Sequence, residues 1–138
     1  MAFAGISYLA IVVAAVASYI FGAVWYMGLS KYWIAALGKS EAEFKSRKPS
    51  PLPFVIAFVA QLVMAYILAG TIGHLGVGEV TVKNALISAV IVYVGFVLTT
   101  LVTNHGFQGA KPSLTVIDGL HWLGVLLIQG LVIGLFGV

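Results

Sequence analysis

Four long apolar runs dominate this sequence and restrict the solvent in which the chain can fold. They cover residues 5–27, 53–75, 84–104 and 114–137, and they contain no charged side chain apart from Asp118 in the last run. At about 1.5 Å per helical residue, each run is long enough to cross the ~30 Å hydrocarbon core of a bilayer. None alternates with period two, which argues against a transmembrane barrel.

The composition agrees with this pattern. Only 8% of the 138 residues are charged and 62% are hydrophobic. A soluble domain carries about a quarter charged residues, so this chain lacks the polar surface that water requires. We therefore predict an all-α fold, a four-transmembrane-helix bundle with membrane lipid as its main partner. Residues 1–138 are expected to form a single integral membrane domain.

The basic residues are concentrated at one end of the predicted bundle. Six of the seven Lys and Arg side chains lie in the loop 28–52 or just before the last apolar run: Lys31, Lys39, Lys45, Arg47, Lys48 and Lys111. Cytoplasmic loops of membrane proteins carry an excess of such residues. We predict a basic cytoplasmic loop over residues 28–52 and place both termini outside.

A short helix is predicted inside this loop. Ser40 and Glu43 have the spacing of a capping box, which favours a helix from Glu41 towards Arg47. The prolines that follow end it and lead into the second apolar run.

Small residues recur at helical spacing in three of the apolar runs. They are Ala10, Ala14, Ser18 and Gly22 in the first run; Ala57, Ala65, Ala69 and Gly73 in the second; and Gly130 and Gly134 in the fourth. Such rows let helix backbones approach closely in lipid. We interpret them as packing faces, either inside the bundle or between protomers of a homo-oligomer.

Polar and aromatic side chains gather in the half of the predicted bundle next to the basic loop. The candidate polar pocket consists of Trp25, Tyr26, Gln61, Thr100, Thr103, Asn104, Asp118 and His121. Asp118 and His121 lie three residues apart and therefore share a helix face. An ionised carboxylate inside a span is costly and needs a partner, for which Asn104, Thr103 or a tyrosine is suitable.

Three interpretations of this cluster remain open. In the first, the cluster is a structural clamp that joins the third and fourth helices. In the second, it is a substrate or proton site that opens to the cytoplasm. In the third, it is a metal site made by His105, Asp118 and His121. No closely spaced histidine pair supports the metal site. We therefore expect no metal.

Several classes of function find no support in the sequence. There is no cysteine, which excludes disulfides and thiol chemistry, and the chain lacks the motifs of serine hydrolases, phosphate-binding loops and dinucleotide folds. Basic and aromatic residues do not interleave as a nucleic-acid groove requires. We expect neither an enzyme nor a cofactor, and no nucleic acid among the partners.

Short motifs spread along the whole chain resemble those of a known family. They are Gly22-Ala23-Val24-Trp25-Tyr26, Lys31 and Trp33, Thr99-Thr100 and Asn104, Phe107-Gln108-Gly109, and Asp118-Gly119-Leu120-His121. Their order and spacing are similar to those of the domain of unknown function 1761 family, small and mainly bacterial membrane proteins. Met27-Gly28 departs from the Ser-Pro expected at that place.

The resemblance implies a four-helix protein of the bacterial inner (plasma) membrane and implies no activity. By position, its recurrent polar and aromatic residues are Trp25, Tyr26, Trp33, Thr100, Asn104 and His121. Our leading hypothesis is an oligomer whose cytoplasm-facing pocket binds or transports a small molecule or a proton. The alternative is a non-transporting scaffold or accessory subunit. The sequence does not identify a small-molecule ligand.

Overall fold

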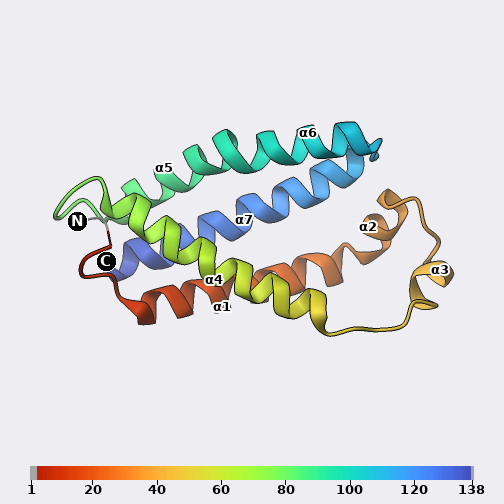
Figure 1. Ribbon diagram of the computed structural model, residues 1–138, viewed down its shortest axis with the longest axis horizontal. Coiled ribbons are helices and arrows are strands. Elements are labelled where there is room, and N and C mark those ends of the chain that lie inside the picture. Colours follow the sequence, from red (N-terminus) through yellow and green to blue (C-terminus); the bar gives the residue numbers. More distant parts are fainter. Residues whose placement is uncertain (1–2, 138) are drawn as a thin grey trace.

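The computed structural model describes residues 3–137, and within that range the chain forms helices and no strand (Figure 1). The spans are α1 (Tyr8–Gly28), α4 (Leu52–Gly73), a third span built from α5 (Val82–Val92), η1 (Tyr93–Leu98) and α6 (Thr99–Gln108), and α7 (Pro112–Phe136). All four are long and apolar enough to cross a membrane. The predicted four-helix membrane bundle is confirmed.

The helix ends follow from local signals, and the third span is longer than predicted. The Thr81 hydroxyl accepts a bond from the Asn84 backbone N–H at 3.2 Å, which caps the start of α5. Gly109 ends α6 with a φ of 67°, a left-handed conformation that favours glycine. Pro112 then occupies the first turn of α7, where its missing N–H costs nothing.

The most buried span is α7. It runs along the middle of the bundle, with α1 and α4 on one side and the third span on the other (Figure 1). Among the spans, 44% of the apolar stretch of α7 is buried, against 17% of that in the third span. The central position of α7 means that polar groups on its inner face meet side chains from the other spans.

The rows of small residues on α1 and α7 lie inside the bundle, and of the row on α4, Ala65 and Ala69 are buried. All four members of the row on α1 are buried, as are Gly130 and Gly134 of α7. A methyl group added at Gly134 would lie 2.6 Å from the Cα of Val82, so the backbones of α7 and α5 are in contact there. The rows on α1 and α7 therefore pack helices within the bundle.

The third span contains a π-helical segment that the sequence does not reveal. Along η1 the backbone hydrogen bonds join residues five apart instead of four, a rare pattern that shifts the faces of the helix that follows. The Tyr93 hydroxyl at its start donates to the Gly119 carbonyl at 2.7 Å, which ties the third span to α7. This bond lies one residue from Asp118.

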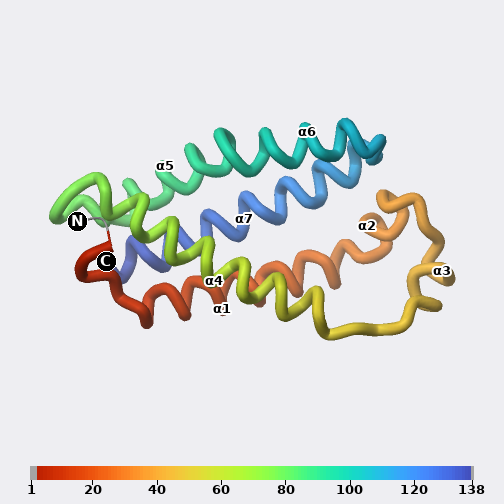
Figure 2. Tube along the Cα trace, in the orientation of Figure 1, coloured from red at the N-terminus to blue at the C-terminus, as the bar shows by residue number. Residues whose placement is uncertain are grey.

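The basic loop carries two short helices, α2 (Ser30–Ala36) and α3 (Glu41–Lys45). The predicted start of α3 is confirmed, because the Ser40 hydroxyl accepts the Glu43 N–H at 3.1 Å. It ends at Lys45, and α2 was not predicted. Figure 2 shows both short helices at one end of the bundle, with both ends of the chain at the other.

A glycine pair tests this packing. Gly134→Ala should lower the free energy of unfolding by about 1–3 kcal/mol, because its methyl group overlaps the backbone of α5. Gly95→Ala is the matched control, since a methyl group there meets nothing within 4 Å. Unfolding in bicelles measures both. Equal stability of the two variants would contradict the close contact of α5 and α7.

Candidate functional site

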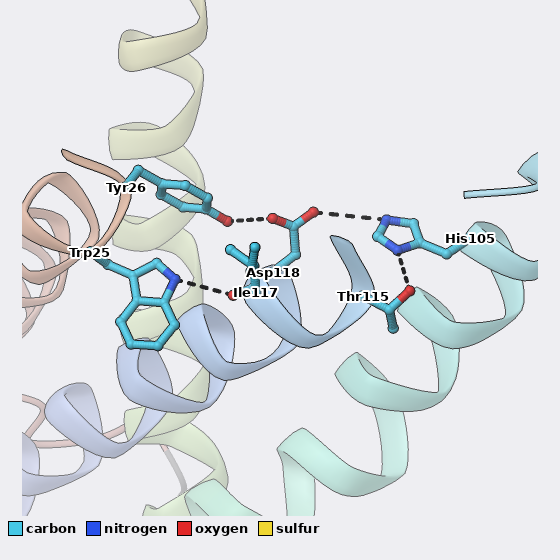
Figure 3. A network of polar contacts seen from close by, with 6 residues as sticks. All are labelled: Trp25, Tyr26, His105, Thr115, Ile117 and Asp118. Atoms are coloured by element: carbon cyan, nitrogen blue, oxygen red, sulfur yellow. Dashed lines mark hydrogen bonds and ion pairs between the residues drawn. The ribbon is translucent and has the colours of Figure 1, made fainter. Parts of the chain in front are cut away.

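Asp118 is the centre of a polar network that joins three spans (Figure 3). One carboxylate oxygen accepts the hydroxyl of Tyr26 in α1 at 2.7 Å, and the other lies 3.9 Å from Nε2 of His105 in α6. The side chain of Asp118 is 20% exposed and that of His105 is 12% exposed. The carboxylate is thus held by a donor and is still partly exposed.

The imidazole of His105 is oriented by a second contact. Its Nδ1 lies 2.8 Å from the hydroxyl oxygen of Thr115, one turn before Asp118 on α7 (Figure 3). The ring therefore bridges two residues of α7. Either ring nitrogen can carry the proton, so the tautomer decides which neighbour receives a bond.

Trp25 completes the contact between α1 and α7. Its indole Nε1–H donates to the Ile117 carbonyl at 3.1 Å (Figure 3). Because Trp25 and Tyr26 are consecutive, the last turn of α1 contacts α7 at two adjacent residues, Ile117 and Asp118. This double contact fixes the position of the Tyr26 hydroxyl relative to the carboxylate.

Asp118 lies near the start of α7 and therefore near one end of the membrane span. It is six residues after Pro112, or about 9 Å along the helix. A carboxylate near a helix N-terminus is stabilised by the positive end of the helix dipole. The position is also shallow in the span, where an ionised side chain costs less than at the centre of the bilayer.

His121 is enclosed and has no hydrogen bond to Asp118. Its side chain is buried among the aromatic rings of Phe21, Tyr26 and Trp122, with centroid distances of 6.1, 4.8 and 4.7 Å. It presses on Gly22, where an added methyl group would lie 2.8 Å from Nε2. Within residues 3–137, its buried Nδ1 has no hydrogen-bond partner. Its position is that of a packed side chain.

Gln61 lies in a separate cluster halfway along α4. The Ser18 hydroxyl donates to Gln61 Oε1 at 2.7 Å, and Gln129 Nε2 donates to the Ser18 oxygen and the Gln61 carbonyl, both at 3.1 Å. All three side chains are buried. The cluster links α1, α4 and α7 away from Asp118. The Gln129 Oε1 atom is unpaired within the described part of the chain.

Thr100, Thr103 and Asn104 are not brought to Asp118. All three are exposed on α6, and the two threonine hydroxyls donate to backbone carbonyls of their own span, those of Phe96 and Thr99. Depth in the membrane, which the sequence supplies, does not fix which way a side chain points around its helix. Of the expected partners of Asp118, the tyrosine is the one that bonds to it.

From the sequence, His105 is grouped with Asp118 only as a candidate metal ligand and is left out of the candidate polar pocket, although a signal for its contact with α7 exists. Leu98 and Leu101 approach Gly119 of α7, and His105 follows them at the next helical step. A polar residue that continues an apolar packing row points towards the same neighbour. The row therefore predicts contact between His105 and α7.

Two hollows of the surface are described by their linings, and neither is lined by Asp118. A hollow of about 570 Å³ lies at the opposite end of the bundle, with His74 and Val80 on its wall. A shallower one of about 230 Å³ lies between the third span and α7, beside Thr115 and Gly119. In the part of the chain that the structure describes, no three His, Cys, Asp or Glu side chains are grouped to hold a metal.

The arrangement supports proton exchange more readily than enclosure of a molecule. A partly exposed carboxylate, a phenol hydroxyl and an imidazole within contact distance are groups that accept and donate protons.

Comparisons with known proteins agree with the family resemblance. The model of the family described as "Protein of unknown function (DUF1761)" matches residues 9–134, nearly the whole chain. Searches of the curated proteins and of the solved structures gave no match. The chain therefore belongs to the domain of unknown function 1761 family of membrane proteins.

Proposed function

We propose that the protein exchanges a proton between the cytoplasm and Asp118, and that this exchange is the basis of its activity as a small transporter or proton-linked binding protein. The observation that carries the proposal is the position of the carboxylate. It lies within a span, bonded to Tyr26 and 3.9 Å from His105, and its side chain is partly exposed. Ionisable residues within spans typically mark ion or proton pathways.

The packing of His121 limits which side chains can accept the proton in this proposal. Because this ring is buried among aromatic side chains and has no bond to Asp118, the proton-accepting pair is Asp118 and His105. A larger ligand bound between Asp118 and His121 would have to displace the aromatic side chains that surround the His121 ring. A proton or hydronium ion requires no such movement, so the contacts favour a proton over a larger molecule.

A scaffold or accessory subunit is the second candidate, and the cluster of Ser18, Gln61 and Gln129 favours it. These side chains bridge three spans and are buried, as an interhelical clamp requires. In that case the contacts of Asp118 with Tyr26 and His105 are a second clamp near the end of the bundle.

Replacing Asp118 distinguishes these candidates. In liposomes loaded with a pH-sensitive dye, the wild-type protein should pass protons down an imposed gradient, and Asp118→Asn should abolish this flux because Asn cannot bind the proton. Glu43→Gln is the matched control, since it removes an exposed carboxylate outside the spans.

Infrared difference spectra recorded after a pH change add a direct readout. The wild-type protein should show a carboxyl band from Asp118, and this band should be missing from the spectrum of Asp118→Asn. Unchanged flux in Asp118→Asn, with the fold intact, would contradict the proposal. If the wild-type protein passed no protons and Asp118→Asn only lowered thermal stability, the clamp would be the better explanation.

We also propose that the end of the bundle with α2 and α3 faces the cytoplasm of a bacterial cell and that both termini face outward. Five of the seven basic residues lie between Lys31 and Lys48 at that end, and such loops stay on the cytoplasmic side.

The absence of cysteine makes this orientation simple to measure. Ser46→Cys, close to α3, should be protected from a membrane-impermeant maleimide in intact spheroplasts and should react after lysis. Val77→Cys, in the exposed turn at the opposite end, should react in both cases. The reverse pattern would invert the proposed topology.

An oligomer is proposed on a separate observation. No residue of α6 is buried, and its outer face carries Thr99, Thr103 and Asn104. The hydroxyls of Thr99 and Thr103 already donate to carbonyls of their own span, so Asn104 is the side chain that a bond to another helix would stabilise. A methyl group added at Gly106 would meet nothing within 4 Å, so a second helix can approach this face closely.

Crosslinking tests this interface. Under mild oxidation in the membrane, Asn104→Cys should give a disulfide-linked dimer because the two copies of α6 face each other. Ile67→Cys, on the exposed face of α4, should remain monomeric. Equal crosslinking at both positions would indicate random collision and would remove the proposed role of α6.

A further inference from the structure

The end of the protein that contains α2 and α3 carries a concentrated positive charge. Five exposed basic side chains lie there, compared with two acidic ones, Glu41 and Glu43. The basic residues are Lys31, Lys39, Lys45, Arg47 and Lys48. We call this set the basic surface. At the opposite end of the bundle, the charged side chains of the described residues are Glu79 and Lys83, so the charge there is balanced.

The charge of the basic surface is not neutralised within the protein. Among residues 3–137, the one contact of 4 Å or less between a basic and an acidic side chain is that of His105 with Asp118, and neither Glu41 nor Glu43 contacts a basic side chain in this way. Lys111 differs from the basic surface, because its Nζ donates to the Ala35 carbonyl at 3.1 Å. The five exposed cations are therefore available to an external anion.

The length of α1 indicates that the basic surface lies at the level of lipid headgroups. The 21 residues of α1 span about 31 Å at 1.5 Å per residue, which matches the ~30 Å hydrocarbon core. Gly28 and Leu52, which end α1 and begin α4, thus lie at its boundary. The residues between them fall in the headgroup layer, and the exposed Tyr32 beside Lys31 is typical of that layer.

A chain of aromatic contacts holds the loop against the bundle. The ring of Tyr26 packs edge-on to Trp33 of α2, and Trp33 packs edge-on to Phe44 of α3, with centroid distances of 5.4 Å in both cases. The guanidinium of Arg47 lies 4.1 Å from the centre of the Phe44 ring. The loop therefore presents its cations from a packed frame that begins at α1.

We propose that the basic surface binds the headgroups of anionic phospholipids. Charge complementarity and position support this partner. The cations are unpaired and lie beside the bilayer, where each Lys or Arg near an anionic surface adds to the attraction. Negatively charged headgroups are then concentrated around the end of the protein that contains Asp118. The proposal does not depend on proton exchange at that residue.

Quenching of tryptophan fluorescence by brominated lipids tests the proposal. Trp25, Trp33 and Trp122 all lie in the half of the bundle near the basic surface. In phosphatidylcholine vesicles, brominated phosphatidylglycerol should quench more strongly than brominated phosphatidylcholine. The ratio of the two association constants should be about tenfold in dilute buffer and approach one in 1 M salt, where screening acts over about 3 Å.

Two loop variants should move this ratio in opposite directions. Lys45→Gln combined with Arg47→Gln and Lys48→Gln should reduce it to near one, because three cations are lost. Glu41→Gln combined with Glu43→Gln should increase it, because two repelling carboxylates are lost. This second variant keeps the test decisive if the first one fails to fold. Lys83→Gln, at the opposite end, is the matched control and should leave the ratio unchanged.

Three results would overturn the proposal. The first is a wild-type ratio near one at low salt, and the second is a ratio that both loop variants leave unchanged. The third is competition by a soluble polyanion. If a single-stranded oligonucleotide or an acidic peptide removed the quenching by phosphatidylglycerol at micromolar concentration, the basic surface would belong to that class of partner.

Discussion

The close approach of α1 to α7 is the contact on which the rest of the structure depends. Lipid tails are as apolar as the helices, so the bundle is held by close packing and a few polar bonds. The buried small residues of α1 permit that packing, and Gly22 leaves room for the ring of His121. The same interface contains the bond from Tyr26 to Asp118 and one side of the cluster around Gln129.

The two ends of the bundle differ in chemistry because its polar groups are distributed unevenly. The end with the basic loop carries the carboxylate, the imidazole of His105 and a set of unpaired cations. Beyond the cluster of Ser18, Gln61 and Gln129, the core is apolar, with Ala14, Leu68 and Ile133 among its members. A proton that reaches Asp118 therefore meets few polar groups beyond mid-span within one protomer. Passage of protons across the membrane, as proposed, therefore requires that a second copy complete the path beyond mid-span.

The sequence predicted the number of spans and the family because both depend on long uniform features. Charge-free runs are unambiguous in a chain of this composition. It also predicted that Tyr26 and Asp118 share one end of the bundle, because depth follows from counting residues along a helix. The rotation of each helix could not be derived in this way. Thr103 and Asn104 have suitable depth and point away from Asp118, and the π segment that precedes them leaves no clear mark in the sequence. Helix α2 was missed because it is short and has no side-chain cap.

The π segment also affects how the third span is joined to the bundle. Before it, α5 packs closely on α7 at Gly130 and Gly134; after it, α6 has no buried residue. Among the described residues, His105 makes the side-chain bond that links α6 to α7. The third span thus packs closely along its first half and is attached by few contacts along its second half, with the irregular turn between them. The bond of His105 to Thr115 and its 3.9 Å contact with Asp118 use opposite nitrogens of one ring, so a rotation of that ring changes both the surroundings of the carboxylate and the attachment of α6.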